Sequence, residues 1–152
     1  MKANDLMIGD WVNFYDAQAY KVTSIHINNK GCAVRLEFDE YIVETWAGKI
    51  EPIPLTEEIL KANGFEDATF GYGRHCLRIK GSVADSKITK YYSVEYHPKG
   101  CYPPSPDLEQ FIDIMLNIGS IRLNCYYVHE LQHALRLCGL NELADNFKVT
   151  TD

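Results

Sequence analysis

The sequence has 152 residues, enough for one domain or two small ones, and 46% of them are hydrophobic, as in an ordinary folded protein. No apolar run reaches the length of a membrane span, and the first residues lack the charged-then-apolar pattern of a signal peptide. The five cysteines show no C-x-x-C spacing, which fits reduced and mostly buried thiols. We therefore expect a cytoplasmic protein without membrane contacts, and the net charge of −6 argues against a broadly basic, nucleic-acid-binding surface.

The first fifty residues predict short strands joined by polar turns. We expect these strands at residues 6–12, 19–25, 32–38 and 41–44, because apolar and polar side chains alternate in the second and third runs. Asn28 to Gly31 has the composition of a hairpin turn. The pattern predicts a small β unit of SH3-like size over residues 1–54, with Trp11 and Trp46 as its core anchors.

A short helix is predicted after this unit, because Pro52 and Pro54 interrupt the strand pattern. Thr56 is a good N-cap residue, acidic residues fill the first turn, and Asn63-Gly64 is a stop signal. Strand character returns over residues 69–97, with the segment from Gly81 to Ser86 as the expected connection between two strands.

Residues 107–118 fit either a helix or a strand, and we favour a strand that turns at Gly119-Ser120 into a second strand. The last predicted element is a helix from about Tyr126 to Cys138, with Gly139 as its stop. The expected fold class is therefore α+β. Its second unit, residues 55–152, combines the short helix, an antiparallel sheet and the C-terminal helix.

Residues 129–133 read His-Glu-Leu-Gln-His, the H-E-x-x-H pattern of zinc hydrolases. In such an enzyme His129 and His133 ligate the metal and Glu130 is the general base. A third ligand is required, and the pattern does not identify one. The candidates are Glu142, Asp145, His75, His97 and Cys101.

A helical projection places His129 and His133 opposite the apolar stripe that contains Leu131 and Leu135. We therefore interpret the motif as a solvated helix face, so that we expect no cofactor and favour a non-enzymatic protein, although the sequence leaves the enzyme question open. A zinc-dependent peptidase or hydrolase is the alternative. A structural zinc held by residues of the His75-Cys76 and His97-Lys99-Cys101 segments is a weaker hypothesis, because their spacing matches no standard zinc motif.

The block from residue 71 to 100 is the only basic part of the chain, with six Lys or Arg against two acidic residues. Its candidate nucleic-acid-binding residues are Arg74, Arg78, Lys80, Lys87, Lys90 and Tyr92. Such a basic, aromatic hairpin can contact phosphates and stack bases. We favour the simpler interpretation of a solvated sheet face whose tyrosines pack in the core.

Three segments, MKANDLMIGDWV, IEPIPLTEEILKANGF and YYVHELQHALRLCGLNELADNF, together resemble a family of small uncharacterised proteins encoded by gut Bacteroidales and their prophages or other mobile elements. Relatives with Gln and Asn in place of Glu130 and His133 imply that the common role needs no zinc pair there. The resemblance implies a cytoplasmic accessory or binding protein of a mobile element. We expect it to act through contacts with a protein partner that the sequence does not identify.

Overall fold

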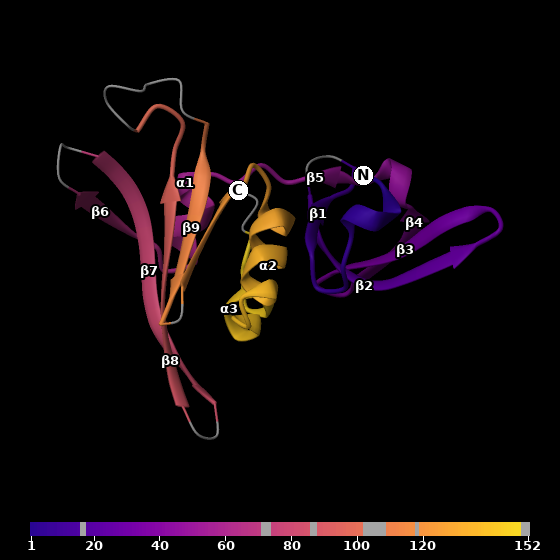
Figure 1. Ribbon diagram of the computed structural model, residues 1–152. Coiled ribbons are helices and arrows are strands. Elements are labelled where there is room, and N and C mark those ends of the chain that lie inside the picture. The colour runs from indigo at the N-terminus through magenta and orange to yellow at the C-terminus, as the bar shows by residue number, and fades with distance from the viewer. Residues whose placement is uncertain (16–17, 71–73, 86–87, 102–108, 118, 150–152) are drawn as a thin grey trace.

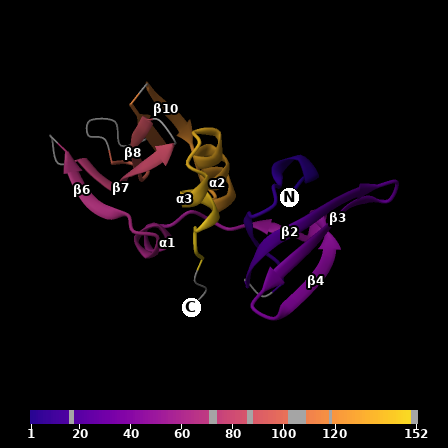
Figure 2. The same cartoon turned by 90° about the horizontal axis from the view of Figure 1, so that it is seen from below.

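The computed structural model describes residues 1–15, 18–70, 74–85, 88–101, 109–117 and 119–149. It contains two antiparallel five-stranded sheets, and the C-terminal helices lie between them (Figures 1 and 2). The predicted α+β class is therefore confirmed. Every helix in the described part of the chain is too short or too polar to traverse a lipid bilayer.

The first sheet is bent into half of a barrel and has the strand order β4-β3-β2-β1-β5. Its strands are β1 (Trp11–Asn13), β2 (Ala19–Asn28), β3 (Gly31–Phe38), β4 (Tyr41–Trp46) and β5 (Glu51–Pro52), with the 3-10 helices η1 (Ala3–Asp5) and η2 (Ala47–Lys49). The predicted hairpin is confirmed, because Asn28 pairs with Gly31 and its side chain accepts a hydrogen bond from the Lys30 amide. The predicted strand over residues 6–12 is mostly wrong, because the chain turns at Gly9 (φ +93°) before β1 begins.

The second sheet has the strand order β10-β9-β8-β7-β6. Its strands are β6 (Glu66–Phe70), β7 (Arg74–Asp85), β8 (Ile88–His97), β9 (Phe111–Leu116) and β10 (Gly119–Asn124). The β9–β10 pair confirms the favoured strand interpretation of residues 111–116. The connection predicted from Gly81 is wrong, since β7 continues to Asp85. Gly81 pairs with Tyr92, and a Cβ at Gly81 would overlap the Tyr92 ring.

The α-helices in the described segments are α1 (Glu57–Ala62), α2 (Val128–Leu137) and α3 (Asn141–Asp145). Thr56 caps α1 as predicted, because its hydroxyl accepts a hydrogen bond from the Ile59 amide. At the end of α2, Gly139 adopts the positive φ of +74° that favours glycine at a helix stop. Pro54 and Leu55 contact the chain just before α2, through a bridge to Tyr127 and a hydrogen bond to the Tyr126 carbonyl.

The described buried apolar residues form two clusters. The smaller cluster is formed by residues of the first sheet and its adjoining segments, and it contains Val12, Val22, Val34, Leu36 and Ile50. The larger one joins the second sheet to the helices and contains Leu60, Leu77, Val94, Ile112, Ile114, Leu131, Leu135 and Phe147. Trp11 packs against the larger cluster, so a residue of β1 contributes to the core of the second sheet. The division of the chain at residue 54 stays a prediction.

Candidate functional site

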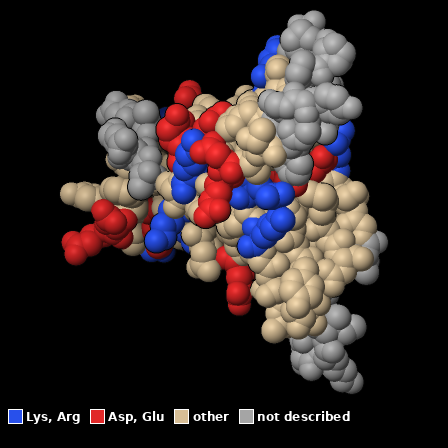
Figure 3. Space-filling view, turned by 90° about the vertical axis from the view of Figure 1, so that its left-hand side faces the viewer, with Lys and Arg blue, Asp and Glu red and all other residues tan. Residues whose placement is uncertain are grey.

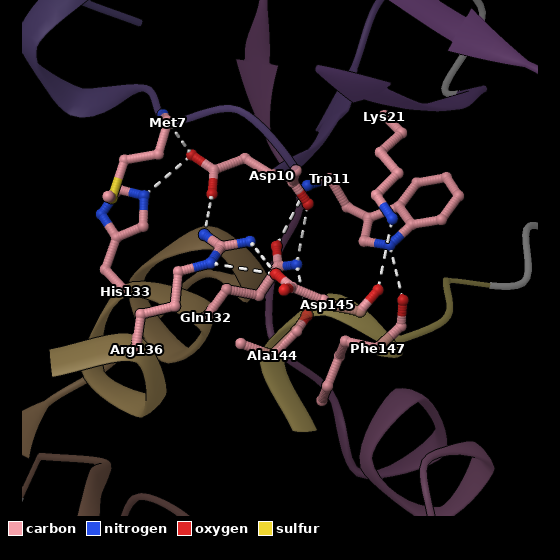
Figure 4. Close-up of polar contacts among 11 residues, drawn as sticks. Met7, Asp10, Trp11, Lys21, Gln132, His133, Arg136, Ala144, Asp145 and Phe147 are labelled. Atoms are coloured by element: carbon pink, nitrogen blue, oxygen red, sulfur yellow. Dashed lines mark hydrogen bonds and ion pairs between the residues drawn. The ribbon is translucent and has the colours of Figure 1, made fainter. Parts of the chain in front are cut away.

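Helix α2 carries the HELQH residues and is covered on two sides. Its predicted apolar face is confirmed, because Val128, Leu131, Ala134 and Leu135 are buried in the larger cluster. The opposite face packs on the first sheet, so the predicted solvated face is wrong: His129 is only 6% exposed and Gln132 is 0% exposed. Because β1 and the turn before it lie on this face, the motif is at the junction between the two sheets (Figure 4).

Gln132 connects three backbone groups at this junction. Its Oε1 accepts a hydrogen bond from the Trp11 amide at 3.0 Å, and its Nε2 donates to the Gly9 carbonyl at 3.1 Å. Nε2 also donates to the Ala144 carbonyl at 3.0 Å, which ties α3 to the same side chain (Figure 4). The amide therefore satisfies polar groups of the turn, of β1 and of α3 at once.

Asp10 is a fully buried carboxylate beside Gln132. Its Oδ2 accepts hydrogen bonds from the Met7 amide at 2.7 Å and from Nε2 of His133 at 2.8 Å. Its Oδ1 accepts from Nη1 of Arg136 at 2.9 Å (Figure 4). Arg136 also donates to the exposed Asp145, through Nε and Nη2. The buried charge is thus paired, as burial of a carboxylate requires.

The two tryptophans do not anchor the core of the first sheet, and that prediction is wrong. Trp11 reaches toward the C-terminal segment, where its Nε1 donates to the Phe147 carbonyl at 2.6 Å (Figure 4). Lys21 of β2 binds the neighbouring Asp145 carbonyl. Trp46 is 42% exposed, because it projects from β4 on the side away from the small cluster and lies beside Gly31.

Glu130 has a structural partner at the start of α2. Its Oε2 accepts hydrogen bonds from the amides of Tyr126 at 2.7 Å and Tyr127 at 3.1 Å. Both amides precede the helix, and Tyr127 is its N-cap residue, so Glu130 satisfies groups that the helix leaves unpaired. The carboxylate that would act as general base in a zinc hydrolase is thus engaged in capping.

His129 is buried between aromatic rings. It stacks on Tyr127 with ring centroids 5.8 Å apart, and it meets His133 edge to face at 5.7 Å. Burial lowers the pKa of His129 below its usual 6.5, and the His133 charge acts in the same direction. The carboxylates of Asp10 and Glu130 oppose this shift. The neutral imidazole is therefore favoured at this position.

A cleft of about 530 Å³ lies beside these residues, where η1 approaches the start of α2. It is lined by Met1, Asn4, Asp5, Pro52, Tyr127, His129, Glu130 and His133. Among the described residues, the two histidines belong to no group of three metal-binding side chains whose ligand atoms lie within 4.8 Å of one another. Asp145, which we considered as a third ligand, instead pairs with Arg136.

A group that meets this distance criterion lies on the second sheet and consists of Cys76, Glu95 and His97. The weaker zinc hypothesis expected the segments His75-Cys76 and His97-Lys99-Cys101 to converge, and of these residues the structure brings Cys76 and His97 together. His75 points to the other face, where it lies 3.6 Å from Glu57 of α1. Glu95 was missed, although strand alternation places it on the same face as His97.

The proposed basic hairpin is only partly described. Lys87 and the side chains of Arg74 and Lys90 lie outside the described residues. Arg78 and Lys80 share one face of β7, whereas Tyr92 lies on the other face, across from Gly81 and against the larger cluster. Tyr92 is therefore not a base-stacking partner for these two cations.

Acidic and basic residues are interspersed on the side of the molecule that faces away from the first sheet (Figure 3). Within the second sheet, Arg78 also has an acidic partner, because its guanidinium lies 3.8 Å from the buried Glu95. Nucleic-acid binding through a basic surface requires cations gathered on one face. The arrangement in this view does not favour that hypothesis.

The open edge of the first sheet carries exposed apolar residues that the sequence analysis missed. Strand β4 pairs only with β3 in the described structure. Tyr41, Ile42 and Trp46 on this strand are 70%, 55% and 42% exposed. Ile42 and Trp46 lie on the same face, opposite Glu37 and Ala33 of β3.

No family model, curated protein or solved structure matches this chain. The fold and the contacts described above are therefore the basis for any functional conclusion.

Proposed function

We propose that the protein is a non-enzymatic binding protein whose open β4 edge pairs with an extended segment of a partner protein. The observation that carries the proposal is the row of exposed apolar side chains, Tyr41, Ile42 and Trp46, on a strand at the edge of a sheet. We further propose that it acts in the cytoplasm as an accessory protein of a mobile element or prophage, as the sequence resemblance implies.

An edge strand presents backbone N–H and C=O groups that can pair with another chain. Many binding modules use such an edge, with backbone hydrogen bonds providing affinity and alternate side chains providing specificity. In β4, Ile42, Glu44 and Trp46 share one face. A partner strand beside β4 would therefore contact two apolar side chains with a carboxylate between them.

The charges around β4 define the chemistry of the partner. Four acidic residues lie within residues 37–44: Glu37, Asp39, Glu40 and Glu44. The nearby Arg35 pairs with Glu37 at 3.5 Å, which leaves the segment acidic. A partner strand that complements this edge would alternate basic side chains with apolar ones. A second copy of this chain would instead bring another acidic edge against β4, so we assign the edge to a different protein.

A test of this proposal uses a displayed library of random ten-residue peptides, selected against the purified protein. We expect enrichment of peptides that alternate apolar residues with Lys or Arg. Their binding should slow hydrogen exchange of β4 amides and should weaken with added salt. The variants Ile42→Lys and Trp46→Ala should each weaken binding by about tenfold or more, as loss of a central apolar contact does.

Leu137 provides the matched control, because it is 87% exposed on α2 and distant in sequence from β4. The Leu137→Ala variant should bind the selected peptides as the parent protein does. Enrichment of acidic peptides, or protection of amides outside β4, would contradict the proposal. A stable dimer that dissociates in the Trp46→Ala variant would assign the edge to a second copy instead.

A further inference from the structure

We propose that Cys76, Glu95 and His97 form a zinc-binding site on the face of the second sheet that points away from the helices. The three residues are buried, at 0%, 8% and 3% exposure. Their ligand atoms, one from each residue, all lie within 4.8 Å of one another. This site is separate from the HELQH residues and from the β4 edge, so it does not rest on the proposed function.

The positions of the three residues follow from strand pairing. Leu77 of β7 pairs with Tyr96 of β8, which places Cys76 beside His97 on the opposite face. Glu95 and His97 are two residues apart in β8 and share that face. Two adjacent, paired strands therefore hold all three ligands, and the backbone needs no rearrangement to bring them together.

The distance between the imidazole and carboxylate ligand atoms suits zinc. His97 Nε2 lies 3.4 Å from Glu95 Oε2. Nitrogen and oxygen ligands that each lie about 2.0–2.1 Å from a tetrahedral zinc ion are separated by about 3.3 Å. A thiolate, an imidazole and a carboxylate are all common zinc ligands. With a neutral imidazole, the thiolate and carboxylate would balance the two charges of the ion, which favours binding in a buried place.

Neighbouring charges would hold the ligands in position. Arg78, Glu95, Asp113 and Arg122 are cross-strand neighbours on β7 to β10. Oε1 of Glu95 lies 3.8 Å from Arg78, which leaves Oε2 directed toward His97. Asp113 lies 3.9 Å from His97 Nε2 and is itself held by two 2.7 Å hydrogen bonds from Arg122. Asp113 approaches the same nitrogen as Glu95, so its carboxylate adds negative charge where the cation would bind.

The first experiment is cobalt titration of the metal-free parent protein, followed by absorption spectroscopy. A thiolate-bound tetrahedral cobalt ion gives a charge-transfer band in the near ultraviolet and intense visible bands. We expect both at one cobalt per chain, and we expect added zinc to displace the cobalt. This measurement needs no variant, so it is independent of any effect of mutation on folding. Absence of a thiolate band would overturn the proposal.

Zinc content then assigns the ligands. Parent protein loaded with zinc and desalted should retain about one ion per chain by elemental analysis, as one complete site implies. Cys76→Ser should lose this zinc and the thiolate band, whereas Cys138→Ser, a change at a half-buried thiol outside the cluster, should keep both. Retention of zinc by Cys76→Ser would overturn the assignment. Loss of zinc in His133→Asn but not in Cys76→Ser would place the ion at HELQH.

Discussion

The buried carboxylate of Asp10 lies 2.8 Å from Nε2 of His133, although 123 residues separate them in the sequence. This contact joins the turn before β1 to α2, and Arg136 adds a second bond to the same carboxylate at 2.9 Å. The last histidine of HELQH is thus a partner of a buried acid at the junction of the two sheets. The contacts at this junction lead to predictions about stability that are separate from those for the β4 edge and the zinc site.

The Asp10→Ala variant should lose about 3 kcal/mol of unfolding free energy, because removal of the buried carboxylate leaves partly buried charged and polar groups without their partner. These groups are the Met7 amide, His133 and Arg136. Urea unfolding measures the loss. The control is Asp145→Ala, which removes the exposed partner of Arg136 and should cost less than about 1 kcal/mol. Equal losses in the two variants would contradict the central role of Asp10.

The Gln132→Leu variant should lose about 3 kcal/mol of unfolding free energy, because a leucine of similar size leaves three backbone groups, one buried and two partly buried, without this partner. These groups are the Trp11 amide and the Gly9 and Ala144 carbonyls. The matched control is Gln110→Leu, which removes one side-chain hydrogen bond, to the Cys125 carbonyl, and should cost about 1 kcal/mol. A Gln132→Leu protein as stable as its parent would show that these contacts contribute little.

The apolar stripe of α2 could be predicted, because Leu131 and Leu135 repeat at the helical period within a few residues. The contact of α2 with the first sheet could not be predicted. It depends on Asp10 and Trp11, more than 100 residues upstream, and no local pattern shows that a Gln between two histidines is buried. The same reasoning applies to the zinc cluster. Strand alternation places Glu95 and His97 on one face of β8, which the local sequence shows. Cys76 lies beside them only because of the register between β7 and β8, which the local sequence does not show.

Stability should fall as the pH decreases below about 6.5, in part because of His129. Burial lowers the pKa of His129 in the folded protein. Above pH 6.5 the residue is neutral in both states and contributes no pH dependence. Below 6.5 the unfolded chain binds the proton first, so protonation favours unfolding until the folded-state pKa is reached. The carboxylates of Asp10, Glu130 and Asp5 raise the pKa of His129, but burial, together with the charge of His133, lowers it by more.

The measurement for His129 is the unfolding free energy in urea at pH 7.5 and at pH 5.5. The parent should lose more stability between these values than His129→Gln does, since only the parent carries the titrating imidazole. His26→Gln is the control, because His26 is exposed on β2, and this variant should follow the parent profile. If His129→Gln shows the same or a larger loss than the parent, the predicted sign is wrong.

Cys125 should resist alkylation in the folded protein far more strongly than Cys32. Cys125 has no exposed surface, and burial, with a further contribution from the charge of Glu130, raises its pKa to about 12. At pH 9 only about one such thiol in a thousand is ionised, and the thiolate is the species that reacts with iodoacetamide. Cys32 is only half-buried.

Timed alkylation at pH 9, followed by peptide mass spectrometry, should detect modification of Cys32 while Cys125 remains unmodified. In denaturant both should react at similar rates, which shows that the protection comes from the fold and not from the local sequence. Because Cys125 packs with Val128 and Leu131 in the larger cluster, its modification also reports on opening of the core beneath α2. Equal rates for Cys32 and Cys125 in the folded protein would contradict the buried position of this thiol.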